Sequence, residues 1–257
     1  MEPVKVTTAG GVMTATLVDV ENRNALGAAL LQGLYEAIVS ANDDPTVRAV
    51  VVTNEGNTFC AGANLKQQSG AVAADRPTVG LDDLLHTIQT SPTPVIGRIA
   101  GHVVGGGNGL AAALDISIAA DDAKFGFTEV RLGVAPAIIS VVCLPKMRPG
   151  EAMEAFLRGN RFPAARAAEL GLINRAVPRE ELDAAVEEVL ADLRKGGPNA
   201  LGQAKRLVYE VPAMEQKQAF QWTSRLSAEL FRGEEAAAGM KAFLTRSKPP
   251  WAEPDPD

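Results

Sequence analysis

The 257-residue sequence is poor in cysteine, histidine and aromatic side chains, with two cysteines, two histidines and 5% aromatic residues. Cys60 and Cys143 suit neither a disulfide framework nor a zinc site, so a reducing compartment and no bound metal are expected. No apolar run is long enough to cross a bilayer, and residues 1–4 lack a secretory pattern. The net charge of −6 argues against general nucleic-acid binding. We therefore expect a cytoplasmic protein without membrane or nucleic-acid partners.

Hydrophobic residues make up 46% of the chain, which is enough for a sizeable core. Apolar residues recur every four positions at Leu26, Leu30, Leu34 and Ile38, and this spacing predicts a helix that ends near residues 42–45. A second helix is predicted over 81–90. Strands are expected at 4–8, 12–18, 47–53, 95–100 and 116–119. This alternation of strands and helices predicts an α/β core.

The pattern changes between Leu132 and Gly150. Beyond about residue 136 the strand signals nearly vanish and helices are predicted one after another, while the tail from Pro249 is expected to fray. Helices are expected at 137–147, 150–158, 164–170, 179–195, 199–210 and 214–232. We therefore predict a core over residues 1–195, helical from about 137, and a C-terminal helical region over 196–257.

Small residues crowd two stretches, Phe59–Lys66 and Gly105–Gly107. Glycine lets the backbone approach a ligand closely, and two backbone N–H groups aimed at one point form an oxyanion hole. A dinucleotide fingerprint is excluded because Leu110 stands where its third glycine would be, and the Gly-Lys-Ser/Thr of a phosphate loop is absent. Taken by itself, the triple glycine could instead serve tight packing between a helix and a strand.

Six segments together resemble the crotonase superfamily of enoyl-CoA hydratases and isomerases. They occur in the family order at 22–26, 59–63, 101–107, 121–133, 164–174 and 239–249. This combination is specific for the superfamily but not for one reaction, because many chemistries share the fold. The resemblance implies a ββα spiral core with a C-terminal helical oligomerisation region, assembled as a homotrimer or a dimer of trimers.

The resemblance also implies a coenzyme A thioester as substrate and no other cofactor. The thioester oxygen would lie between the N–H groups of Ala63 and Gly106, and Glu129 would transfer the proton. Lys248 would reach CoA bound to a neighbouring subunit, although Lys66 and Lys248 also suit solvated surface lysines. The residues implied in substrate or CoA binding are Arg23, Ala25, Ala61, Asn64, Leu65, Lys66, Gly105, Gly109, Leu132 and Lys248.

Glu129 has two interpretations from the residues alone. Apolar neighbours, among them Phe125, Phe127, Val130 and Leu132, would raise the pKa of its carboxyl group by desolvation, as an acid/base catalyst requires. The alternative is a surface glutamate in a charged segment that also holds Asp121, Asp122, Lys124 and Arg131. Alignment with the family motif favours the catalytic interpretation.

Gly109 departs from the family pattern, in which hydratases usually carry a second glutamate at this position. Hydration uses two carboxylates comfortably, whereas one carboxylate suffices for double-bond isomerisation. A glutamate at position 109 is expected to project into the cleft opposite Glu129. Asn108 is expected to point elsewhere, His102 to make a structural hydrogen bond, and His86 to be a surface residue. The sequence therefore predicts hydration or isomerisation of an enoyl-CoA, with a non-catalytic acyl-CoA-binding protein as the alternative.

Overall fold

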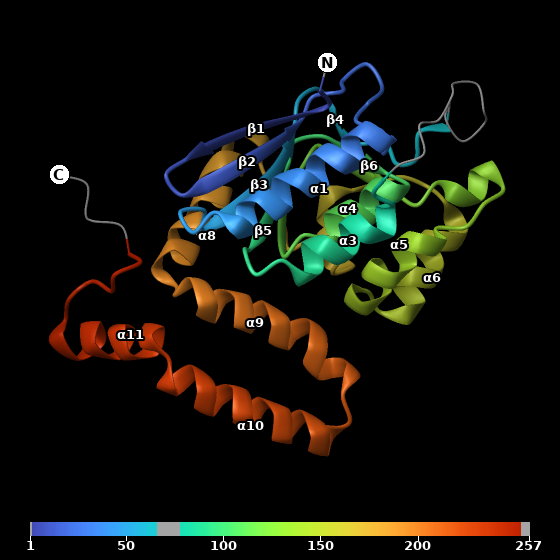
Figure 1. Cartoon of the computed structure of the whole chain (residues 1–257). Coiled ribbons are helices and arrows are strands. Elements are labelled where there is room, and N and C mark those ends of the chain that lie inside the picture. Colours follow the sequence, from blue (N-terminus) through green and yellow to red (C-terminus); the bar gives the residue numbers. More distant parts are fainter. Residues whose placement is uncertain (1, 66–77, 253–257) are drawn as a thin grey trace.

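Two β-sheets form the centre of the protein in a computed structural model that describes residues 2–65 and 78–252 (Figure 1). The strands are β1 (Val4–Ala9), β2 (Val12–Leu17), β3 (Ala49–Asn54), β4 (Thr58–Cys60), β5 (Val95–Ile99), β6 (His102–Val104), β7 (Ile116–Ala120), β8 (Lys124–Gly126), β9 (Phe162–Pro163) and β10 (Arg175–Val177). The larger sheet has the order β1-β2-β3-β5-β7-β10, and the smaller one has the order β4-β6-β8-β9.

Helices surround these sheets and continue beyond them. The α-helices are α1 (Ala28–Asp43), α3 (Leu81–Thr90), α4 (Gly106–Ala113), α5 (Ala137–Cys143), α6 (Pro149–Arg158), α7 (Ala164–Glu169), α8 (Leu182–Lys195), α9 (Pro198–Glu210), α10 (Gln216–Arg232) and α11 (Glu234–Thr245). The short 3₁₀ turns are η1 (Glu129–Leu132), η2 (Leu144–Lys146), η3 (Arg179–Glu181) and η4 (Val211–Ala213).

The chain alternates between the two sheets before each helical segment. β5 joins the larger sheet, β6 joins the smaller one, and α4 follows; β7, β8 and η1 repeat this order. The pairings β3–β5 and β5–β7 are parallel, as are β4–β6 and β6–β8. The α/β class and the spiral ββα order predicted from the sequence are therefore confirmed.

The central strand β3 is buried on both faces. Val50 and Val52 belong to the hydrophobic cluster that includes α1 and α3, whereas Ala49 and Val51 pack in a second cluster with α8. Parallel strands covered by helices on both faces become continuous apolar runs, as the sequence of β3 shows.

The predicted helix periodicity is confirmed in α1 for Leu30, Leu34 and Ile38, which are buried, and the helix ends at Asp43. Leu26, expected on the same helix face, instead precedes α1 and pairs with Ala63 of the first loop. Strands are sparse after residue 136, as expected, but two short ones, β9 and β10, lie between there and residue 252. β10 extends the larger sheet by pairing with β7, with Ala176 opposite Ala119. Strands of two or three residues are too short to show a period of two, so the sequence carried no signal for them.

A buried ion pair fastens α9 to the core. The Lys205 ammonium lies 2.8 Å from the Asp115 carboxylate and donates to the carbonyl of Ile88 at 2.6 Å. Asp115 also accepts the N–H of Val95 at 2.8 Å. Burial raises the pKa of Asp115 and lowers the pKa of Lys205, so each group relies on its partner.

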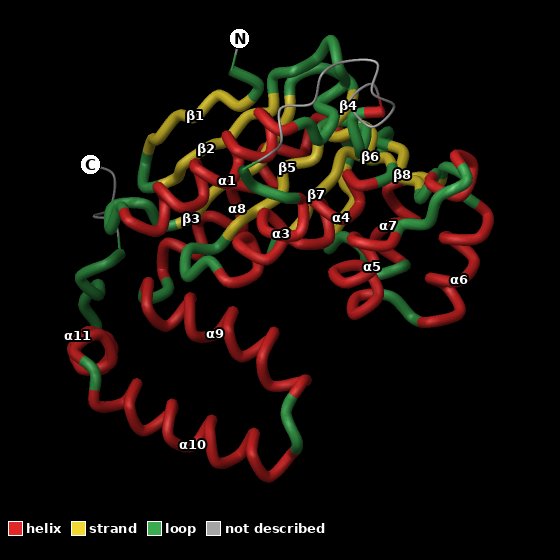
Figure 2. The backbone as a smooth tube through the Cα atoms, turned by 45° about the vertical axis from the view of Figure 1, so that its right-hand side comes forward, coloured by secondary structure: helices red, strands yellow, loops and turns green. Residues whose placement is uncertain are grey.

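Helices α10 and α11 stand away from the sheets as an arm (Figures 1 and 2). Only Leu226 of α10 and Ala242 of α11 are buried among their residues. The tail expected to fray is held up to residue 252, because the Trp251 indole donates to Lys195 O at 3.0 Å and the Arg48 guanidinium donates to Trp251 O at 2.8 Å. Within the described residues, none of the helices has the length and apolarity that crossing a bilayer requires.

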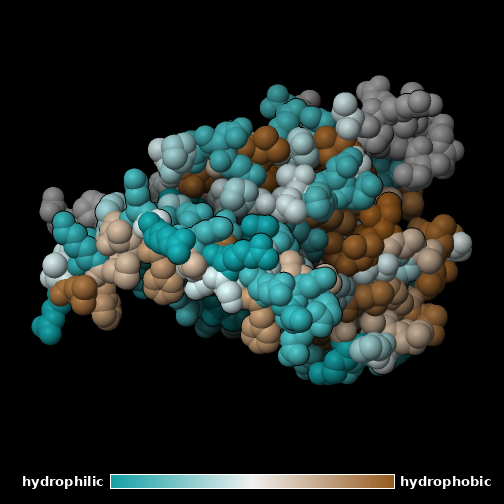
Figure 3. Space-filling view, turned by 60° about the horizontal axis from the view of Figure 1, so that its bottom comes forward, coloured by the Kyte–Doolittle hydropathy of each residue, from teal (hydrophilic) through white to brown (hydrophobic). Residues whose placement is uncertain are grey.

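A hydrophobic patch covers the outer face of α5 and α6. Figure 3 shows apolar residues gathered on the right-hand side, where these helices lie. The exposed large apolar residues of α5 and α6 include Ile138, Val141, Met153 and Leu157, and Leu132, Val134 and Leu144 are exposed in the segments next to these helices; we call this set the α5–α6 patch. An exposed surface of this kind usually marks a binding or assembly site.

Candidate active site

The first glycine-containing loop follows β4 and pairs with the segment that precedes α1. The Ala61 N–H donates to Arg23 O at 3.1 Å, and the Leu26 N–H donates to Gly62 O at 2.7 Å. Gly62 has a φ of +83°, and a β-carbon there would lie 2.8 Å from both Gly106 N and Val104 O. Only glycine permits this approach, which brings the first loop against the second.

The second loop joins β6 to α4 at Gly105, which has a φ of +55°. The Gly105 N–H donates to Gly126 O at 2.9 Å, so the loop is tied to the end of β8. α4 begins at the next residue, Gly106, and residues 107–113 of this helix are all buried. The helix therefore presents its first N–H groups, and the positive end of its dipole, beside the first loop.

The backbone N–H groups of Ala63 and Gly106 meet where the two loops converge. A β-carbon built on Gly106 would lie 3.7 Å from Ala63 N. In the described parts of the chain, neither N–H has a hydrogen-bond acceptor. Two neighbouring unpaired donors can stabilise negative charge on one oxygen, which is the arrangement of an oxyanion hole.

Glu129 begins η1, and its carboxyl group lies beside this pair of loops. Its Oε1 atom would be 3.6 Å from a β-carbon on Gly105, and its buried Oε2 atom has no hydrogen-bond partner in the described residues. Burial raises the pKa of the Glu129 carboxyl group above its ordinary value. A half-buried carboxyl group with a raised pKa next to two unpaired donors can exchange a proton with a bound molecule.

Of the four apolar neighbours predicted for Glu129, two are buried and two are exposed. Phe125 and Phe127 are fully buried, and the ring of Phe127 lies 4.5 Å from that of Phe156 between centroids. Val130 and Leu132 are instead 37% and 57% exposed. The buried aromatic side chains therefore pack under the segment that carries Glu129, while Val130 and Leu132 remain on the surface.

Gly109 does not open onto a free space. A β-carbon on Gly109 would lie 2.7 Å from the β-carbon of Ile139 on α5, and both residues are buried. The room that the sequence led us to expect for a second carboxylate is taken by Ile139. The sequence offered no signal for this contact, because the two residues are joined only by the packing of α5 on α4.

Asn108 turns its side chain toward backbone rather than toward Glu129, as predicted. Its amide donates to Gly105 O at 3.0 Å and to Gly126 O at 2.9 Å. The predicted structural role of His102 is also confirmed, because its Nδ1 accepts the Lys124 N–H at 3.1 Å and joins β6 to β8. His86 is exposed on α3 and lines a hollow with Tyr35, not with Glu129.

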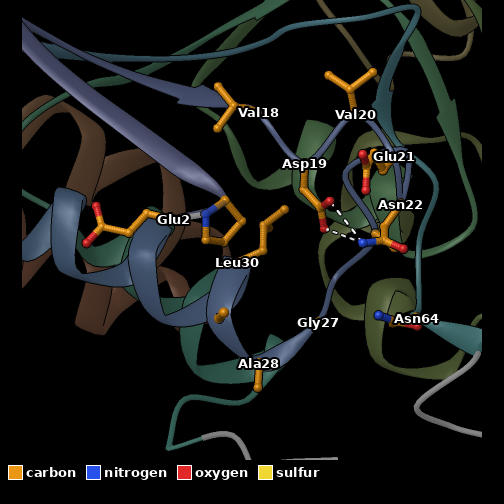
Figure 4. A pocket seen from close by; sticks show the side chains of 13 residues that line it. Glu2, Val18, Asp19, Val20, Glu21, Asn22, Gly27, Ala28, Leu30 and Asn64 are labelled. Carbon is orange, nitrogen blue, oxygen red and sulfur yellow. Dashed lines mark hydrogen bonds between the residues drawn. The ribbon is translucent and has the colours of Figure 1, made fainter. Parts of the chain in front are cut away.

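A pocket of about 390 Å³ lies next to the first loop (Figure 4). Ala25 and Asn64, both predicted to bind CoA, line it together with the carboxylates of Glu2, Asp19 and Glu21. The Asp19 carboxylate accepts two hydrogen bonds from the Asn22 amide, at 3.0 and 3.1 Å. The structure thus brings two of the predicted contacts into one acidic pocket.

The remaining predicted contacts are dispersed. Arg23 and Leu65 are exposed near the first loop, and Ala61 is half-buried there. Lys66 lies outside the described residues. Lys248 is exposed and follows α11, which is far from α4 in both views (Figures 1 and 2). Across residues 2–65 and 78–252, no three His, Cys, Asp or Glu side chains gather in a way that could hold a metal ion.

Comparisons with known proteins find similarity to one enzyme family along nearly the whole chain. The family model described as enoyl-CoA hydratase/isomerase matches residues 7–254. A carnitinyl-CoA dehydratase of Salmonella arizonae is 30% identical over 97% of this chain and 98% of its own length. The structure of a Marinobacter aquaeolei enoyl-CoA hydratase/isomerase is 28% identical with a TM-score of 0.90, covering 98% of this chain and 100% of that one. Pseudomonas aeruginosa AtuE is 30% identical with a TM-score of 0.89 over the same shares.

Proposed function

The chain belongs to the enoyl-CoA hydratase/isomerase family, and on that premise we propose that it is an acyl-CoA enzyme with one carboxylate acid/base. The N–H groups of Ala63 and Gly106 hold the thioester oxygen of an enoyl-CoA, and Glu129 moves the proton. The observation that carries this proposal is the half-buried Glu129 carboxyl group beside two backbone donors that have no acceptor within residues 2–65 and 78–252.

The proposed chemistry follows from where charge develops. When the Glu129 carboxylate removes a proton from Cα of a 3-enoyl thioester, the electron pair moves onto the thioester oxygen and forms a dienolate. The two backbone donors stabilise that charge, each contributing about 2.7–4 kcal/mol if it acts like an oxyanion donor of other enzymes. The protonated Glu129 then returns the proton to Cγ, which gives the 2-enoyl thioester without any other reactant.

Double-bond isomerisation is our first candidate because it needs a single carboxylate. Ile139 fills the space beside Gly109, so a second acid has no room opposite Glu129 in this backbone. Hydration is the second candidate and is favoured by the relatives described as enoyl-CoA hydratases. Another group would then have to hold the attacking water.

CoA binding is proposed for the residues around the first loop and at the end of the arm. Ala25, Ala61, Asn64 and Leu65 would contact the neutral part of CoA, and Leu132 and Gly105 the acyl side. Gly109, which the sequence also placed among these contacts, is covered by Ile139 and is not proposed as one. The carboxylates of the pocket in Figure 4 would repel phosphate groups. We therefore propose that the phosphates are bound by cations, namely Arg23, Lys66 and Lys248.

The proposed assembly is a homotrimer or a dimer of trimers. The arm exposes large apolar side chains, including Phe220, Phe231, Phe243 and Leu244, of which Phe243 is 84% exposed. Such surface is costly in water, and the α5–α6 patch offers a second apolar surface. Two other apolar residues of α10 pack within the chain instead: Leu226 is buried, and the Arg206 guanidinium lies 5.0 Å from the Trp222 ring centroid. Lys248, which follows the arm, would then meet CoA bound to a neighbouring subunit.

The decisive experiment is a panel of 2-enoyl-CoA and 3-enoyl-CoA substrates followed by mass spectrometry and chromatography. Isomerisation gives products of unchanged mass that elute differently, whereas hydration adds the mass of one water. Tight binding of every thioester without turnover would favour the alternative, an acyl-CoA-binding protein on the same fold. Lack of both binding and turnover would contradict the proposal.

A further inference from the structure

Asn108 is completely buried at the junction of the second loop and α4. Its amide nitrogen donates to Gly105 O at 3.0 Å and to Gly126 O at 2.9 Å. Because both neighbours are carbonyl oxygens, the nitrogen and not the oxygen of the amide must face them. The side chain therefore acts as a double donor between two backbone segments.

The first of these carbonyls belongs to the peptide that carries an oxyanion donor. Gly105 C=O and Gly106 N–H are the two ends of one planar peptide unit. Fixing the carbonyl oxygen therefore fixes the direction of the Gly106 N–H on the opposite side of the unit. A hydrogen bond to the carbonyl also polarises the peptide and strengthens the N–H as a donor.

The second carbonyl leads to the acid/base residue. Gly126 ends β8, and the chain runs from it through Phe127 and Thr128 to Glu129. One amide thus connects the peptide of the oxyanion donor to the strand that delivers the carboxyl group. The separation between these two groups must be maintained within a fraction of an ångström for efficient proton transfer.

The two carbonyls do not need Asn108 for their own hydrogen bonding. Gly105 O already accepts the backbone N–H of Asn108 at 2.9 Å, and Gly126 O accepts the N–H of Gly105 at 2.9 Å. Removing the side chain leaves neither oxygen without a donor, so the expected effect on folding is small compared with its effect on orientation.

We propose that Asn108 is a positioning residue, which orients the Gly106 N–H toward the thioester oxygen and keeps it in register with Glu129. This inference rests on the proposed function, since it assumes that the Gly106 N–H binds the substrate oxygen. Ser117 on β7 provides a matched control because it is equally buried. Its hydroxyl also donates to a carbonyl of α4, that of Ala111 at 2.7 Å, but this contact is at the C-terminal end of the helix, away from the second loop.

The test compares Asn108→Ala and Ser117→Ala in steady-state kinetics on the best enoyl-CoA substrate. We expect Asn108→Ala to lower kcat on the order of 10- to 100-fold, as small misplacements of reacting groups do. The KM should stay within about threefold, because the lost interaction acts mainly in the transition state. Ser117→Ala should keep wild-type kcat. If the alanine variant folds poorly, Asn108→Val fills more of the buried space, supplies no hydrogen-bond donor and should lower kcat equally.

Difference infrared spectroscopy of a bound acyl-CoA gives a readout that does not depend on turnover. An oxyanion hole lowers the thioester carbonyl stretching frequency, and we expect Asn108→Ala to lose most of that shift while Ser117→Ala keeps it. If the wild-type protein shows the frequency shift but no turnover, and Asn108→Ala loses the shift, the inference is supported and the proposed reaction is contradicted. Unchanged kcat and shift in Asn108→Ala, or equal losses in Ser117→Ala, overturn the inference. A wild-type protein without any shift overturns both.

Discussion

Ile139 occupies the position that a side chain on Gly109 would need, with its β-carbon 2.7 Å from where the β-carbon of residue 109 would lie. The glycine is therefore required by the packing of α5 on α4. The family's second glutamate cannot be restored at this position by one substitution, because the protein interior is too densely packed to absorb the added atoms.

We predict that Gly109→Glu destabilises the fold by about 1–3 kcal/mol or more and adds no hydratase activity. Gly109→Glu with Ile139→Gly should recover part of the stability and raise water addition to a short 2-enoyl-CoA. Urea unfolding and product analysis measure both effects. Gly150→Glu is the control, since a β-carbon there meets no atom within 4 Å. A single Gly109→Glu variant as stable as wild type would contradict this prediction, because it would show that α5 can move to accommodate the added side chain.

Glu129→Gln should lower kcat by about 10²–10⁴-fold, because it preserves shape and removes the acid/base group. The affinity for CoA thioesters should remain close to that of wild type, and calorimetric titration measures it. Glu154→Gln on α6 is a suitable control, since Glu154 makes an exposed ion pair with Arg158. Wild-type kcat in Glu129→Gln would mean that another group transfers the proton.

The raised pKa of Glu129 predicts a pH-dependent stability difference between wild type and Glu129→Gln. Below the unfolded-state pKa the carboxyl group is protonated in both the folded and the unfolded state, so its burial does not lower the free energy of unfolding. As pH rises from that value through the raised folded-state pKa, the unfolded state releases the proton first, so wild type loses stability relative to the variant. Thermal unfolding of both proteins between about pH 4 and pH 8 should show Glu129→Gln gaining on wild type across this window. A constant difference in Tm would mean that the pKa of Glu129 is the same in both states.

The ion pair between Lys205 and Asp115 should be important for docking α9. Lys205→Met leaves the Asp115 carboxylate buried without this partner, at an expected cost of about 3–5 kcal/mol. Adding Asp115→Asn should recover part of that loss, since no buried charge then remains at this position. Lys195→Ala removes an exposed ion pair to Asp192 and should cost about 0–1 kcal/mol. Equal losses in urea unfolding for Lys205→Met and Lys195→Ala would disprove a special role for burial.

The exposed apolar side chains of the arm predict self-association. Light scattering at micromolar concentration should give the mass of a trimer or a hexamer, and Phe243→Glu should shift the population toward smaller species. The neighbouring Lys241→Ala is the control, because it changes a solvated polar residue on the same helix. A wild-type protein that scatters as a monomer would contradict the proposed assembly.

The sequence by itself determined the elements whose residues interact locally or repeat regularly. The four-residue spacing of Leu30, Leu34 and Ile38 set the buried face of α1, and the β-branched run of β3 predicted a strand, which the structure shows to be buried on both faces. The glycine-rich loops were also legible, because close backbone contact requires the absence of a side chain, as the neighbours of Gly62 demonstrate. The family resemblance added the order of the motifs and the roles expected of them.

Only the tertiary structure decided how residues from separate elements meet. It placed Ile139 against Gly109, turned the amide of Asn108 onto two backbone carbonyls, and paired Lys205 with Asp115. None of these contacts follows from spacing along the chain, because each depends on how helices pack on the sheets and on one another. For Glu129 the sequence left two interpretations open, a carboxyl group with a raised pKa and a surface glutamate. The folded structure favours the first, because desolvation is set by the atoms that surround the carboxyl group.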